Sequence, residues 1–230
     1  MRTLGIVGGI GPDSTVDYYR SIIHAWREQT KDGSSPSIVV NSIDLKKMLD
    51  LVAANELPTL TEYLGDAVQR LARAGADVGL LAANTPHIVF DELQRRSSVP
   101  LISIVEVTRE AAEELGLCRV GLFGTRFTMQ GHFYPNVFSK AGIVLVVPDG
   151  NEQAYIHDKY MNELVKSVFL PETRDRLLAI VDRLATEENV QGLILAGTEL
   201  PLILREAGCS IPFLDTTQIH VKAALRHLLF

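Results

Sequence analysis

The chain has 230 residues, of which 47% are hydrophobic and 22% charged, with a net charge of −6. This length suits one large or two small globular domains with a core that needs no disulfides. The negative, interspersed charge argues against nucleic acid or an anionic membrane as a partner. No segment approaches the roughly 20 apolar residues of a membrane helix, and the N-terminal apolar run is too short for a signal peptide. We therefore expect a soluble, cytoplasmic protein.

Short apolar runs alternate with amphipathic helical patterns, such as residues 60–75 and 172–188. This alternation predicts an α/β fold with mostly parallel sheets. The expected strands are Thr3–Val7, Ser37–Ile43, Val78–Ala82, Leu101–Ile104, Val120–Phe123, Ile143–Val147, Gly192–Leu195 and Phe213–Asp215.

The chain also resembles itself, which indicates an internal duplication. Residues 4–19 align with residues 120–135 at an offset of 116, and residues 99–112 align with 211–224 at an offset of 112. Two further matched segments lie between these pairs, and the order of elements is kept. The duplication predicts two pseudo-symmetric α/β halves.

We expect the first half to comprise residues 1–102 and 214–230 and the second half residues 103–213. Ligands of parallel α/β sheets bind at the carboxyl ends of the strands, and clefts between domains are preferred sites. The sequence therefore predicts a ligand cleft between the halves. The matched segments "LAANTPH" and "LAGTELP" would contribute to it, with Ala83 and Gly197 as equivalent positions.

Five segments carry a family resemblance: "GIVGGIGPDSTVDYYRSI", "NTPH", "LFGTRFTM", "YMNELVKS" and "GTELPLIL". They resemble the pyridoxal-phosphate-independent aspartate/glutamate racemase family from about Leu4 to Ala224. The resemblance implies two pseudo-symmetric α/β domains with the active site between them. It also implies a homodimer, amino-acid metabolism, a small amino-acid or carboxylate ligand and no cofactor.

In that family one cysteine follows the third strand of each half, and the two thiols act on opposite faces of the α-carbon. The resemblance places these positions at Ala83 and Gly197. Neither side chain can exchange a proton, so the two-thiol reaction cannot proceed here. Cys118 and Cys209 are expected at the amino ends of strands, as inert thiols remote from the site.

The candidate substrate-binding residues are Gly9, Ser14, Asn84, Thr85, Thr125, Lys166 and Thr198. The turn "GGIGPDST", with Asp13, Ser14 or Thr15 as N-cap, could bind a carboxylate through backbone N–H groups. Alternatively, it is a tight turn that needs glycine torsions.

Cationic residues could bind a second carboxylate. The resemblance implies that Lys166 contacts the distal carboxylate of the substrate, and the alternative is a solvated helix lysine. For a second cationic position the sequence does not distinguish Lys46 from Lys47.

Glu199 and His87 are the candidate catalytic residues. Partial burial of Glu199 at a strand end would raise its pKa into a useful range, unless it only orients its loop. His87 is the alternative base, unless it bonds to local backbone. The remaining histidines share no ligand spacing, so no metal site is expected.

Two functions fit this pattern. One is isomerase-like or lyase-like chemistry on a small amino acid or carboxylate without a thiol pair. The alternative is a non-catalytic amino-acid-binding protein. Laboratory removal of the cysteines is a weaker explanation, because glycine at position 197 would add backbone freedom beside the site.

Overall fold

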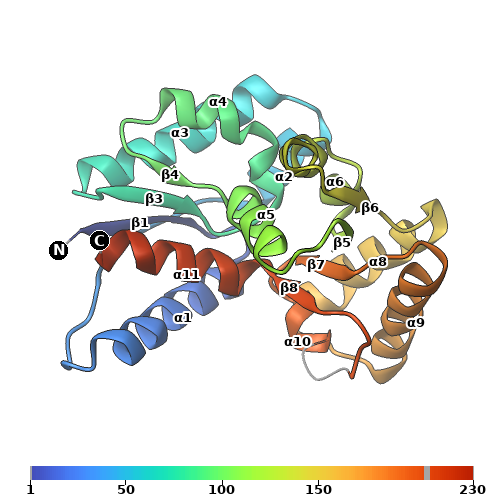
Figure 1. Ribbon diagram of the computed structural model, residues 1–230. Helices are drawn as coiled ribbons and strands as arrows, with labels where there is room; N and C mark the ends of the chain where they lie inside the picture. The colour runs from blue at the N-terminus through green and yellow to red at the C-terminus, as the bar shows by residue number, and fades with distance from the viewer. Residues whose placement is uncertain (1, 205–207, 230) are drawn as a thin grey trace. The chain divides into compact units, whose positions relative to one another are not determined.

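The computed structural model describes residues 2–204 and 208–229. The chain divides into two compact units, Met1–Ile104 with Thr217–Phe230, and Val105–Thr216. Figure 1 shows their helices and strands. Each unit contains one sheet of four parallel strands, which confirms the predicted α/β class.

The first unit has the strand order β2-β1-β3-β4. Its strands are β1 (Thr3–Gly8), β2 (Ser37–Ser42), β3 (Val78–Leu81) and β4 (Leu101–Ile102). Its helices are α1 (Pro12–Thr30), α2 (Leu45–Ala53), α3 (Leu57–Arg73), the 3₁₀ helix η1 (Thr85–Val89), α4 (Phe90–Arg96) and α11 (Thr216–Leu229). Helices α3 and α4 lie on one face of this sheet and α1 and α11 on the other (Figure 1).

The second unit has the matching order β6-β5-β7-β8. Its strands are β5 (Arg119–Gly124), β6 (Val144–Val146), β7 (Gly192–Ala196) and β8 (Phe213–Asp215). Its helices are α5 (Ile104–Glu114), α6 (Arg126–Met129), α7 (Phe133–Phe138), η2 (Ser139–Ala141), α8 (Gly150–Asn162), η3 (Leu164–Lys166), α9 (Pro171–Glu187) and α10 (Leu200–Leu204). The equal strand order is what an internal duplication predicts.

All eight expected strands are present, although the bounds of seven differ from those expected. The largest shift of a single strand end is at β4, where we expected Leu101–Ile104 and the strand ends at Ile102. Helix α5 begins at Ile104, so Ser103 is a buried connecting residue and Ile104 takes the first helical position. A short apolar run does not distinguish these conformations.

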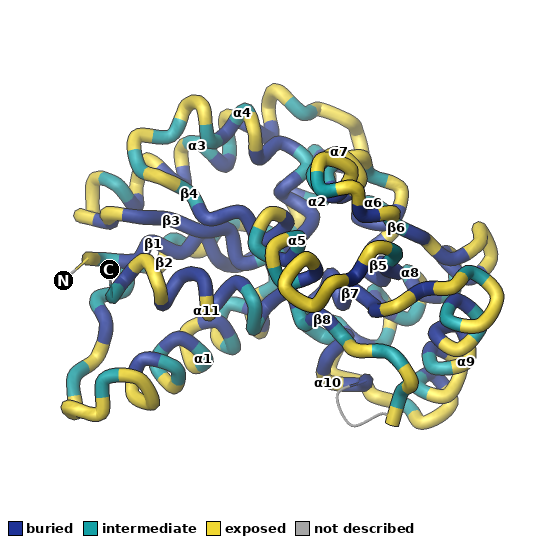
Figure 2. The backbone as a smooth tube through the Cα atoms, viewed as in Figure 1, coloured by how far each residue is buried: buried dark blue, intermediate teal, exposed yellow. Residues whose placement is uncertain are grey.

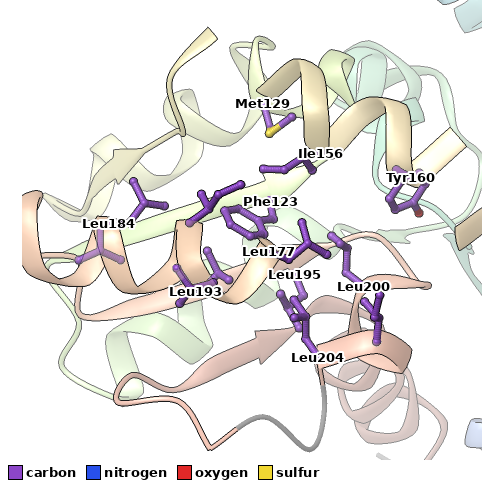
Figure 3. Packing of buried hydrophobic residues seen from close by; sticks show 14 of the residues in the cluster. Phe123, Met129, Ile156, Tyr160, Leu177, Leu184, Leu193, Leu195, Leu200 and Leu204 are labelled. Atoms are coloured by element: carbon purple, nitrogen blue, oxygen red, sulfur yellow. The ribbon is translucent and has the colours of Figure 1, made fainter. Parts of the chain in front are cut away.

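Each unit has its own hydrophobic core. In the first, the central strands are buried (Figure 2), and Tyr18, Ile22 and Trp26 cover them at the four-residue spacing of one helix face. In the second, helix α9 packs Leu177 and Leu184 against Leu193 and Leu195 of β7 (Figure 3). Within the described residues, no helix is both long and apolar enough to cross a membrane.

Candidate functional site

The first group of candidate residues follows two neighbouring strands of the first unit. Strands β1 and β3 pair in parallel, with Val7 opposite Leu81. Their carboxyl ends therefore meet at one edge of the sheet. The glycine-rich turn follows β1 at this edge, and the segment Ala83–His87 follows β3. We call these two segments the first half-site.

The backbone conformation and the close packing of the glycine-rich turn require glycine at position 9. Gly9 has a φ of 83°, which non-glycine residues rarely adopt. An added Cβ there would lie 2.6 Å from Ser42 Oγ and still closer to the carbonyl oxygen of Ile43. The Gly9 N–H donates to Thr15 Oγ1 at 2.8 Å, and the Thr15 hydroxyl donates to the Gly11 carbonyl at 3.0 Å. The turn therefore engages this N–H itself, which favours the tight-turn interpretation.

The predicted N-cap of α1 was wrong. We expected Asp13, Ser14 or Thr15, but the N-cap is Gly11 and no side chain caps it. The reason is Pro12, whose fixed φ and missing N–H suit the first helical position. Asp13 and Ser14 consequently lie within the first turn, where Asp13 complements the helix dipole and Ser14 is buried.

The residues after β3 are largely enclosed. Asn84 and Thr85 are buried, and Ala83 just before them is half-buried. Asn84 stands at the N-terminus of η1, and its carbonyl accepts a hydrogen bond from the His87 N–H at 3.0 Å. The structure thus brings Asn84, Thr85 and His87 together in one tight segment.

Both ring nitrogens of His87 form hydrogen bonds with the backbone. It is 2% exposed, and its Nε2 accepts the Ile104 N–H at 3.2 Å while Nδ1 lies 3.0 Å from the Ala83 carbonyl. Since the Ile104 amide must donate, Nδ1 carries the proton. Burial, with a smaller contribution from His220, lowers the pKa of His87 to about 3. Both ring nitrogens are occupied, and this favours the structural role over the catalytic one.

A second buried histidine supports the same region. His220 Nε2 lies 3.0 Å from the Ile102 carbonyl, and its Nδ1 lies 2.9 Å from the Tyr18 hydroxyl. Burial lowers its pKa to about 4. Together, His87 and His220 hold the backbone at Ile102 and Ile104, where β4 ends and α5 begins.

The second half-site comprises Thr125 and Gly197–Glu199, which follow strands β5 and β7. These strands pair in parallel, with Gly124 opposite Ala196. Thr125 is the N-cap of α6, since its hydroxyl oxygen accepts from the Thr128 N–H at 3.4 Å. The Thr125 hydroxyl therefore caps α6 and lies at the carboxyl ends of β5 and β7.

Glu199 is the carboxylate of the second half-site. It is half-buried, and its Oε2 accepts hydrogen bonds from the Thr198 hydroxyl at 2.7 Å and from the Tyr160 hydroxyl. Tyr160 is not among the site residues predicted from the sequence, although it begins the segment "YMNELVKS" that carries part of the family resemblance. The signal that could have found it is the glycine at position 197, which leaves space for a large side chain from another element.

The candidate lysines lie on the surface. Lys166 is exposed and ends η3. Lys46 pairs with Asp50 at 2.6 Å, and the Lys47 ammonium lies 4.4 Å from the ring centroid of Tyr63. Lys46 and Lys47 thus have local partners on α2 and α3.

The two cysteines lie where the sequence placed them, before strands rather than after them. Cys118 directly precedes β5 and is exposed, and Cys209 precedes β8 and is half-buried. Burial raises the pKa of the Cys209 thiol. In the part of the chain that the structure describes, no group of three His, Cys, Asp or Glu side chains could hold a metal ion.

Comparison with known proteins identifies the family to which this two-unit chain belongs. The sequence model of the Asp/Glu/Hydantoin racemase family matches residues 7–224. The chain belongs to the Asp/Glu/hydantoin racemase family. This family match covers both half-sites, from the end of β1 to the middle of α11.

Several members of the family are similar over nearly the whole chain. The broad specificity amino-acid racemase RacX of Bacillus subtilis is 25% identical over 227 residues, which cover 96% of each chain. A Yersinia pestis protein assigned to the Asp/Glu racemases is 31% identical, with full coverage of both chains and a TM-score of 0.93. An aspartate racemase homologue from Pyrococcus horikoshii is 30% identical, again with full coverage and a TM-score of 0.88. The two-unit α/β fold is thus that of the racemase structures.

Proposed function

We propose that this protein is a cofactor-independent enzyme that removes and returns the α-proton of a small amino acid, with Glu199 as the base. The observation that carries the proposal is the place of Glu199. Its half-buried carboxylate follows β7 two residues after Gly197, the position that the family resemblance assigns to a catalytic thiol. The names of the relatives, which include amino-acid racemases, support an amino acid as the ligand class.

The reaction would be a single-base proton transfer. The α-C–H bond breaks, a Glu199 carboxylate oxygen gains the proton, and the electron pair stays on the substrate as a carbanion conjugated with its carboxyl group. The same group then returns a proton to the α-carbon. Solvent exchange on Glu199 between these steps would replace the α-proton with one from water.

The two family thiol positions differ in their ionisable neighbours. The ionisable residue that follows Gly197 is Glu199. The ionisable residue that follows Ala83 is His87, whose two ring nitrogens hydrogen-bond to the backbone. In the family mechanism the two thiols act on opposite faces of the α-carbon. We therefore propose proton removal from one face, which is exchange when the proton returns to the α-carbon and the first step of an elimination or a non-inverting isomerisation when it does not, rather than two-base racemisation.

The test is loss of the α-proton NMR signal when L- or D-aspartate or glutamate is incubated with the protein in D₂O. We expect the signal to decay for at least one of these amino acids, and Glu199→Gln to slow the decay at least about 100-fold, as loss of a general base does. Glu172→Gln, a charge-matched change at an exposed position on α9, serves as the control and should leave the rate unchanged. Equal rates for wild type and Glu199→Gln would exclude Glu199 as the base.

A second function, amino-acid binding without turnover, is favoured by one observation. The Tyr160 ring lies against Gly197, so the space that the family uses for a thiol is filled. This function predicts saturable binding of aspartate or glutamate by calorimetry together with an unchanged α-proton signal. Decay of that signal would rule it out.

The assembly and setting follow from the family resemblance alone. We propose that the protein acts without pyridoxal phosphate, as a homodimer, in the cytoplasm. That the two half-sites serve the same ligand, and that Lys166 contacts it, stay predictions from the sequence.

A further inference from the structure

The space beside Gly197 is occupied by one side chain. A Cβ added to Gly197 would lie 2.5 Å from Tyr160 Cε2, 2.6 Å from Tyr160 Oη and 2.9 Å from Tyr160 Cζ. Carbon atoms in van der Waals contact lie about 3.5–4.0 Å apart. Even the smallest side chain at position 197 therefore requires the tyrosine ring to move.

The ring is held in place by its surroundings. Tyr160 is 8% exposed and lies on α8, at one end of the hydrophobic cluster that includes Ile156, Leu164 and Leu200 (Figure 3). Protein interiors are close-packed, so a buried ring moves only if its neighbours repack. A side chain at position 197 and the ring at position 160 thus exclude each other.

The hydroxyl of Tyr160 has a defined partner as well. It donates to Glu199 Oε2, which also accepts from the Thr198 hydroxyl. Burial, and next the negative charge of Glu199, raise the pKa of Tyr160 well above its ordinary value. The phenol consequently stays protonated and remains a donor to the carboxylate.

We infer that Tyr160 is a positioning residue that takes the space of the missing second-half thiol and holds the Glu199 carboxylate beside position 197. The first part rests on packing alone. The second part rests on the proposed function, because it gives Tyr160 an influence on proton transfer through Glu199. A side chain at position 197 is then accommodated only where the ring at position 160 is absent.

A double-mutant cycle tests the packing part without any activity. Gly197→Ala should lower the urea midpoint of unfolding in the wild-type background and in Tyr160→Phe, which keeps the ring. In the Tyr160→Ala background, the same change should lower the midpoint far less, because the ring is absent. An equal loss of midpoint in all three backgrounds would overturn the inference.

The ring signals of Tyr160 test the contact with Glu199 if Tyr160→Ala does not fold. The signals of ¹³C-labelled Tyr160, assigned with Tyr160→Phe, should shift at neutral pH in Glu199→Gln, because the hydroxyl loses its negatively charged acceptor. The charge-matched Glu172→Gln should leave these signals unchanged. If Glu199→Gln also leaves them unchanged, Tyr160 does not interact with Glu199.

A second double-mutant cycle tests the influence on chemistry. Tyr160→Phe keeps the ring and removes the hydroxyl that donates to Glu199 Oε2, so it should slow α-proton exchange in the wild-type background and have no further effect in the Glu199→Gln background. A purely structural role would slow exchange by the same factor in both backgrounds. If the wild type exchanges no α-proton, the proposed function fails, while the unfolding cycle and the ring signals of Tyr160 still decide its role.

Discussion

Lowering the pH from neutrality to about 4 is expected to destabilise the first unit by several kcal/mol. His87 and His220 have pKa values of about 3 and about 4 in the folded chain, against an ordinary 6.5. Below pH 6.5 the unfolded chain therefore binds more protons than the folded one, and stability falls as the pH falls until the folded pKa values are passed. Each pKa unit corresponds to about 1.4 kcal/mol.

Trp26 provides the signal for this measurement, since it is the single tryptophan of the chain and is buried on α1. Urea unfolding followed by its fluorescence should give a midpoint that drops between pH 7 and pH 4. The double variant His87→Gln and His220→Gln should show a much flatter pH dependence, whereas His24→Gln, at an exposed position, should keep the wild-type slope. A wild-type slope in the double variant would contradict the assignment to buried neutral histidines.

Replacing Gly9 with alanine is expected to destabilise the protein by about 2–5 kcal/mol. The left-handed conformation costs a non-glycine residue about 1–2 kcal/mol, and overpacking costs about 1–3 kcal/mol more. The nearest atom to the added Cβ is the carbonyl oxygen of Ile43, so the clash is relieved only if the backbone moves. The free energy of unfolding in urea measures the loss.

Gly33→Ala is the matched control for this change. Gly33 has a similar φ of 78°, but an added Cβ there would have no neighbour within 4 Å among the described residues. It should therefore show only the conformational cost of about 1–2 kcal/mol. Equal losses for Gly9→Ala and Gly33→Ala would show that packing at the turn is not the reason for Gly9.

The fold could be predicted from local patterns because each strand is a short apolar run bounded by polar or small residues. The self-similarity of the chain also anticipated the equal strand order of the two sheets. Strand ends were less predictable, as at β4, where apolar residues lie on both sides of Ser103, in the strand before it and in the helix after it. The N-cap of α1 was mistaken because Pro12 fixes the helix start more strongly than the polar residues after it.

The candidate site was only partly predictable. Sequence position placed Asn84, Thr85 and Glu199 at strand ends, which the parallel pairing then brought to one edge of each sheet. Tertiary contacts decided the rest. His87 meets the Ile104 amide, and Tyr160 meets Glu199 from 39 residues away in the chain. Such partners leave no local pattern, so the sequence could not separate a structural histidine from a catalytic one.

The measurement that tests the central claim most directly is the configuration of amino acid recovered after incubation in D₂O. Each enantiomer of aspartate and glutamate would be analysed by chiral chromatography with mass detection. Chemistry from one face predicts α-deuterated amino acid of unchanged configuration, with exchange confined to one enantiomer. If the mirror-image amino acid accumulates as fast as deuterium enters, until the two forms are equal, two groups act on opposite faces and the single-base account centred on Glu199 is wrong.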